Sequence, residues 1–149
     1  YKWYEGNPIE GDALVQYPLA QRRLASSVEK TLAAKGFVKI VEGDADFIVI
    51  LHAALSEKTQ LNTPSTGGYG GYGRYGWGGM GGMSTTQVVT YDEATLAVDI
   101  ADSGREELVW RGTATGVVDG AQRDQEEAQA DADEIINTIL ENFPPKTKK

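Results

Sequence analysis

The pattern of apolar and polar positions predicts two amphipathic helices. The first begins at Pro18 and ends before Gly36, and its apolar positions keep the helical period: Leu24, Ala25, Val28 and Leu32. The second ends before Pro144-Pro145 and has a longer apolar stripe, made of Ala128, Ala132, Ile135, Ile136, Ile139, Leu140 and Phe143. Each helix therefore has one face that we expect to pack on a core.

Between the helices, shorter apolar runs predict strands. Tyr1 and Trp3 alternate with polar neighbours in residues 1–4, and Gly6-Asn7-Pro8 ends that strand. Residues 37–41 and 47–55 form two further runs on either side of the turn residues Glu42-Gly43-Asp44. The second run is almost entirely apolar, so we expect a central strand that is buried on both faces for much of its length.

Three more strands are predicted after a glycine-rich stretch, in residues 85–91, 95–100 and 107–118, with the spacing of an antiparallel meander. The period-2 alternation predicts that one face of the sheet is covered and the other is exposed to solvent, the wet face. The covered positions are Leu96, Val98, Ile100, Leu108, Trp110 and Ala114, and the wet ones are Asp99, Arg111, Thr113 and Thr115.

The order of these elements predicts an α+β fold. It is a two-layer sandwich in which two helices lie on one face of a mainly antiparallel sheet, with a Gly/Tyr-rich insert. The chain of 149 residues fits a single domain, with residues 67–83 as the insert and 144–149 as a C-terminal tail.

Composition narrows the chemistry. The chain has no cysteine, which excludes thiolate metal sites, disulfides and cysteine nucleophiles. A net charge of -8 argues against a nucleic-acid partner, because phosphate binding needs clustered Lys and Arg. No apolar run is long enough to span a bilayer. The chain opens on Tyr1 and not on Met, so the lack of a targeting segment excludes no location.

Three motifs suggest chemistry, and each has a simpler explanation. Gly71, Gly73 and Gly76 match the dinucleotide fingerprint G-x-G-x-x-G, but no helix follows them as that site requires. His52 is the only histidine and lies in the most apolar strand, so we interpret it as a hydrogen-bonded structural residue. The acidic residues near the second helix lack the spacing of a calcium loop and suit a solvated helix N-terminus: Asp124, Glu126, Glu127, Asp131, Asp133 and Glu134. We therefore expect no catalytic residue, no metal and no cofactor.

The insert is the unusual feature of the sequence. Ten of the 18 glycines fall in residues 67–83, and large side chains recur among them every two or three residues. Ordering so many glycines costs more conformational entropy than burying those side chains returns. We therefore expect the insert to become ordered only against a partner, and its candidate interaction residues are Tyr69, Tyr72, Arg74, Tyr75, Trp77, Met80 and Met83. A flexible loop is the simpler alternative.

Several segments resemble a known family. ADFIV at 45–49, the Gly/Tyr/Trp insert, LVWRGTATG at 108–116 and ILENFPP at 139–145 are similar to bacterial envelope proteins grouped as domain-of-unknown-function family 4136. Members are usually lipoproteins, so the resemblance implies the bacterial periplasm, outer membrane or cell surface. It also implies that any membrane contact is made through a lipid anchor that this chain does not contain. The family supplies no catalytic residues. We expect Trp110, Arg111 and Gly112 to determine the fold, with Trp110 on the covered face.

The functional expectation is a non-enzymatic envelope or surface protein that acts through protein-protein interaction. Its partners are copies of itself or another envelope protein, and copies could pair by strand addition at an exposed sheet edge near the first strand to form a polymer or filament. The alternative is a module that binds a small apolar ligand or lipid, with the insert as a lid. An enzyme ranks third, because only carboxylates are left to carry chemistry.

Overall fold

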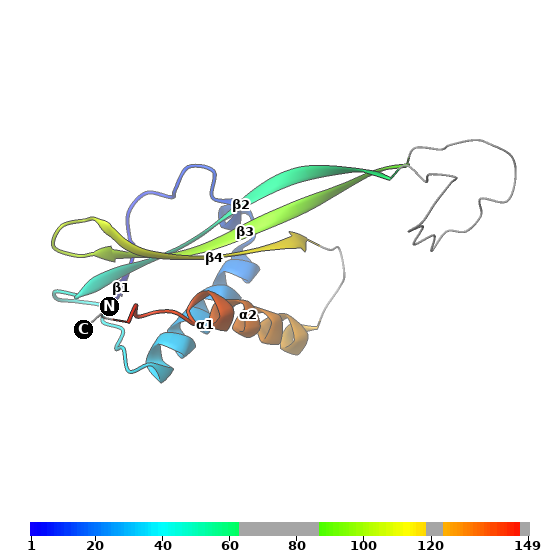
Figure 1. Cartoon of the computed structure of the whole chain (residues 1–149). Coiled ribbons are helices and arrows are strands. Elements are labelled where there is room, and N and C mark those ends of the chain that lie inside the picture. Colours follow the sequence, from blue (N-terminus) through cyan, green and yellow to red (C-terminus); the bar gives the residue numbers. More distant parts are fainter. Residues whose placement is uncertain (63–86, 119–123, 147–149) are drawn as a thin grey trace, which may run out of the picture.

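The fold has two layers, a sheet and a pair of helices (Figure 1). The computed structural model describes residues 1–62, 87–118 and 124–146. Its elements in chain order are β1 (Lys2–Trp3), the short 3-10 helix η1 (Ala13–Gln16), α1 (Pro18–Ala34), β2 (Phe47–Asn62), β3 (Gln87–Asp102), β4 (Leu108–Val118) and α2 (Gln125–Ile139).

The described strands form one sheet in the order β1-β2-β3-β4. β1 pairs parallel with β2, whereas β2, β3 and β4 form an antiparallel meander. Both helices lie on the same side of the sheet (Figure 1). The predicted α+β sandwich is therefore confirmed, with a mixed sheet in which the antiparallel pairs dominate.

Two strand predictions were wrong. Residues 85–91 and 95–100 were expected to be separate strands, but β3 runs without a break from Gln87 to Asp102. Asp92 and Glu93 continue the pairing with β2, because the long partner strand overrides their turn preference. Residues 37–41 are not a strand. They form hydrogen bonds with the first residue instead: Tyr1 N donates to Val38 O at 2.7 Å, and Ile40 N donates to Tyr1 O at 2.9 Å.

The core fills the space between the two layers. Its fully buried members are Val28 and Leu32 of α1, Val49 of β2, Val98 of β3, and Ile136 and Leu140 at α2. An aromatic cluster closes one end, with the rings of Phe143 and Trp110 centred 5.1 Å apart. Trp110 therefore lies on the covered face, as predicted.

Two residues expected in the apolar stripes are exposed. Ile135 is 40% exposed because it lies at the margin of the buried face of α2. Leu108 is 51% exposed because a bulge opposite Ile100 and Ala101 shifts the register at the start of β4. Leu108 pairs with Ala101, on the face opposite the helices, and not with a residue of the covered set.

Polar contacts fix the two helices against each other. Ser27 of α1 is buried, and its hydroxyl lies 2.6 Å from Asp133 Oδ1 of α2. Gln129 Nε2 donates to Ser27 Oγ at 2.9 Å, and Lys30 pairs with Asp133 at 3.0 Å. At its N-terminus, α2 has a capping box in which Asp124 and Glu127 bond each other's backbone N–H. Asp124 and Glu127 thus lie at the N-terminus of α2, as the sequence indicated, and there they cap the backbone.

Candidate functional site

The predicted interaction residues of the insert lie outside the described residues. They are Tyr69, Tyr72, Arg74, Tyr75, Trp77, Met80 and Met83, and the glycine fingerprint at Gly71, Gly73 and Gly76 lies there too. The candidate site is therefore built from the surfaces of the sheet that the structure describes.

The first such surface is a two-stranded ribbon. β4 ends at Val118, which pairs with Asp92, and beyond it residues 58–62 of β2 and 87–91 of β3 pair only with each other and extend beyond the helix layer (Figure 1). Five residues at strand rise span about 17 Å. Val88 and Val89 are 58% and 41% exposed. We call this part of β2 and β3 the ribbon. A two-stranded ribbon with exposed apolar side chains is marginal in water without a further partner.

The second surface is the outer edge of β4. Tyr4 N donates to Val49 O, and Ala53 N donates to Asp12 Oδ1. The backbone N–H and C=O groups of the odd-numbered residues of β2 therefore point away from β3. Because bonding directions alternate along antiparallel strands, Trp110, Gly112 and Ala114 bond β3. The intervening residues of β4 then direct their backbone groups outward: Arg111, Thr113, Thr115 and Val117. Within the described residues, no hydrogen bond joins these outward groups to another element.

β2 has the other long edge, and it is partly covered. β1 and Tyr4 occupy it at Ile48 and Val49. The carboxylate of Asp12, from the loop before η1, accepts from Ala53 N at 3.0 Å. The outer edge of β2 is therefore occupied between Ile48 and Ala53, whereas no such contact covers residues 111–117 of β4 among the described residues.

A charged cluster lies on the sheet face opposite the helices. Asp99 of β3 is 4% exposed. Arg111 holds it with two bonds, Nε to Oδ1 at 2.6 Å and Nη2 to Oδ2 at 2.7 Å. His52 Nε2 lies 2.9 Å from Asp99 Oδ2. His52 is thus hydrogen-bonded, in keeping with its structural interpretation.

The electrostatics of this cluster favour a structural role. Burial opposes ionisation of Asp99, but the hydrogen bonds from Arg111 and His52 outweigh it and hold the pKa of this carboxyl below its usual value. In return, the bond to Asp99 raises the pKa of Arg111. Because both carboxylate oxygens accept bonds, the cluster joins β2, β3 and β4 to one another.

Side chains of the segment from Trp110 to Gly112 make contacts on both faces of the sheet. Trp110 packs on Phe143, while Arg111 points the other way to Asp99. Gly112 lies under the end of α2, where an added Cβ would come within 2.8 Å of Ile139 O and 2.5 Å of the Trp110 ring. A side chain at this position therefore needs α2 to move away from the sheet, and the contacts of all three residues are consistent with their expected role in the fold.

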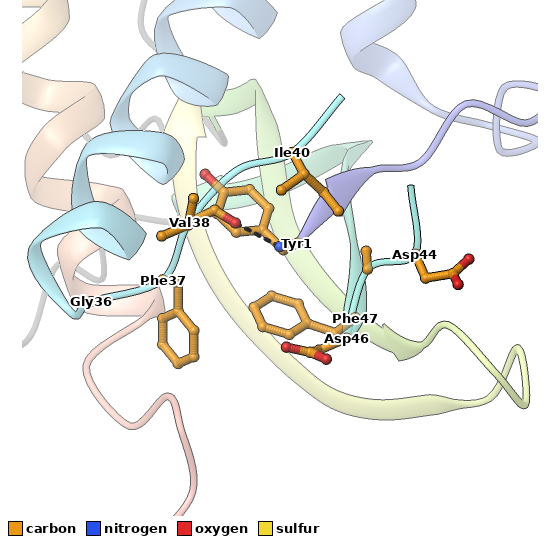
Figure 2. A pocket seen from close by; sticks show the side chains of 9 residues that line it. Tyr1, Gly36, Phe37, Val38, Ile40, Asp44, Asp46 and Phe47 are labelled. Carbon is orange, nitrogen blue, oxygen red and sulfur yellow. Dashed lines mark hydrogen bonds between the residues drawn. The ribbon is translucent and has the colours of Figure 1, made fainter. Parts of the chain in front are cut away.

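A cavity of about 310 Å³ lies at the end of the sheet beside the first residue (Figure 2). Tyr1, Phe37 and Phe47 line it, together with the loop that follows α1. The Tyr1 and Phe47 rings stack at 5.6 Å, so aromatic contacts already fill much of its wall. β2 lines the cavity with its first residue, Phe47, whereas the ribbon lies at the other end of β2.

The described residues offer neither a cluster of metal ligands nor a helix that could span a membrane. Among them, no group of three or more His, Cys, Asp or Glu is placed to hold a metal ion. None of the described helices has the length and apolar character needed to cross a membrane.

Comparison with known families gives a match over nearly the whole chain. The model of the family described as a domain of unknown function, DUF4136, matches residues 1–145. The chain belongs to DUF4136. Comparison with curated protein sequences finds no match.

Two solved structures are similar to this DUF4136 chain. A PDZ domain protein from Parabacteroides distasonis superposes with a TM-score of 0.51 at 10% identity. The DUF4136 chain is covered over 99% of its length but spans only 32% of that protein, so the likeness concerns the fold. A minor lipoprotein from Acinetobacter baumannii gives a TM-score of 0.41 at 13% identity, covering 95% of this chain and 91% of that one.

Sequence reasoning missed both exposed surfaces of this DUF4136 domain. The ribbon was hidden because Asp92 and Glu93 looked like a turn, although the β-branched residues on either side were a usable signal. The free edge of β4 had no local signal, because it depends on which strands pair. The pair of Asp99 and Arg111 could have been found, since both were assigned to the wet face of neighbouring strands.

Proposed function

We propose that this protein acts in the bacterial envelope through protein-protein contacts made by its exposed strands, with copies of itself as the partner. The observation that carries the proposal is the ribbon, which extends beyond the helix layer with Val88 and Val89 exposed. Such a surface is stabilised when another sheet or strand covers it. The envelope location rests on the resemblance to envelope lipoproteins.

The proposed assembly is non-enzymatic. Asp99, the buried carboxylate of the open sheet face, is paired with Arg111 and His52. The ribbon and the edge of β4 are two different surfaces, and a copy that uses both can contact two neighbours. Two different contacts per copy that do not close on themselves generate an open polymer.

The alternative function, binding of a small apolar ligand or lipid, needs a cleft between sheet and helices. In that layer Leu32, Ile136 and Leu140 have no exposed surface, so the described parts of the two layers are in direct contact. No observation on the described residues favours this alternative over strand-mediated assembly.

The test is the size of the full chain in solution. Light scattering over a hundredfold concentration range, with electron microscopy of the same samples, should show mass that rises with concentration. Val88→Lys should reduce that assembly because it places a charge on the ribbon. Val41→Lys is the matched control, since Val41 is 77% exposed but lies in the turn before β2. A monomer at every concentration would overturn the proposal.

A further inference from the structure

β4 has a free edge made of backbone donors and acceptors. Arg111, Thr113, Thr115 and Val117 direct these groups outward, and all four residues are exposed. An edge of this kind is completed by an extended strand, which supplies acceptors and donors at the same spacing. The chemistry of the surface therefore specifies a β-strand as its partner.

Features that block pairing in natural edge strands are missing from most of β4. Edges are commonly protected by Lys, Pro or a bulge. Residues 110–118 contain neither Lys nor Pro, and the bulge lies before them, opposite Ile100 and Ala101. Arg111 is the one charged residue there, and its guanidinium is bonded to Asp99. The edge is thus open to another strand along its regular part.

We propose that the partner is β4 of a second copy, paired antiparallel about Ala114. The inference rests on the proposed function and names one of its contacts. Ala114 is the midpoint of residues 110–118, so this register gives the longest overlap of the regular strand. It places Thr113 opposite Thr115 of the second copy and Arg111 opposite Val117. Their outward groups then make about eight backbone hydrogen bonds.

Side chains fit this register on both faces of the joined sheet. On the open face the two threonines meet, and no arginine faces an arginine, which would be unfavourable. On the helix side Ala114 meets Ala114 of the second copy, and Gly112 meets Gly116. An added Cβ at Gly116 has no atom within 4 Å, so the edge has free space at this point. Two four-stranded sheets thereby become one continuous sheet.

The contact is tested in the full chain with a backbone substitution. Thr115→Pro removes an outward N–H that bonds nothing in its own sheet, and Thr115→Val is the control that keeps it. Both variants lose the hydroxyl contact between Thr115 and Thr95. By sedimentation, T115P should raise the Kd for pairing roughly tenfold to hundredfold relative to T115V. If the wild-type chain associates and T115P associates equally, the β4 contact is wrong while the proposed function stands. If the wild-type chain is monomeric, both the β4 contact and the proposed function are wrong.

Cross-linking tests the register without relying on a proline. The chain has no cysteine, so Ala114→Cys introduces a single thiol on the proposed axis. Opposed Cα atoms there lie within disulfide distance, and mild oxidation should give a covalent dimer. Gly116→Cys is the control: its position is more exposed, but the two copies of it lie on opposite sides of the axis. Equal cross-linking of G116C and A114C, or none of A114C in associating protein, would overturn the register.

Discussion

Gly112 lies where β4 meets the last turn of α2, and its replacement by alanine should weaken the packing of the two layers. An added Cβ would meet Ile139 O at 2.8 Å, Ile139 Cγ2 at 2.8 Å and the Trp110 ring at 2.5 Å. The carbonyl belongs to the helix backbone, so the contact can be relieved only if α2 moves away from the sheet. Overpacking of this kind costs about 1–3 kcal/mol.

Gly116→Ala provides the matched comparison. Gly116 is also on β4, but an added Cβ there has no atom within 4 Å. Alanine at that position should leave stability unchanged or raise it by about 0.5–1 kcal/mol, because it reduces the entropy of the unfolded chain. Thermal unfolding followed by circular dichroism should therefore place the Tm of G112A roughly 2–10 °C below that of the parent. If G112A melts at or above G116A, the close approach of α2 to β4 is wrong.

Three further substitutions probe the fold from other sides. The Ser27 hydroxyl and Lys30 hold the pKa of Asp133 at about 2 instead of 3.8. Above pH 4 the ionised carboxylate therefore contributes at most about 2 kcal/mol to the free energy of unfolding, and this contribution is lost as the pH falls toward 2. Asp133→Asn should flatten stability across this range in acid titrations of urea unfolding. Arg111→Met leaves Asp99 buried without its main partner, and should lower the free energy of unfolding by about 1–3 kcal/mol. Ile139→Asp buries a charge in the core and should abolish cooperative melting; an unchanged melting curve would contradict docking of α2.

Local patterns predicted the helices and the covered face of the sheet because burial alone determines them. The stripe that contains Val28 and Leu32 has the helical period, and Pro18 marks the start of α1 where the structure begins it. Leu96, Val98 and Ile100 alternate along β3 and are all buried. In each case neighbours in the sequence carry the full signal.

Errors arose where a distant partner decided the outcome. Asp92 and Glu93 favour a turn, yet Glu57 and Ser56 of β2 pair with them and keep β3 extended. Leu108 is an even number of residues from Trp110, so alternation predicts it on the covered face. The bulge opposite Ile100 instead puts Leu108 on the other face of the sheet. A local pattern contains neither the partner strand nor the bulge, so it could not have predicted these two results.

The position of β1 affects which part of the sheet edge is covered. Because Lys2 and Trp3 pair with Ile48 and Val49, β1 lies beside β2, and none of the described strands lies beside the outer edge of β4. Had β1 paired with β4 instead, it would bond part of the outward edge of β4 within one copy. The two-residue strand β1 has no sequence signal for its neighbour, and yet it determines which surface remains available to a second copy. The effect of T115P on association therefore tests the sheet order as well as the contact.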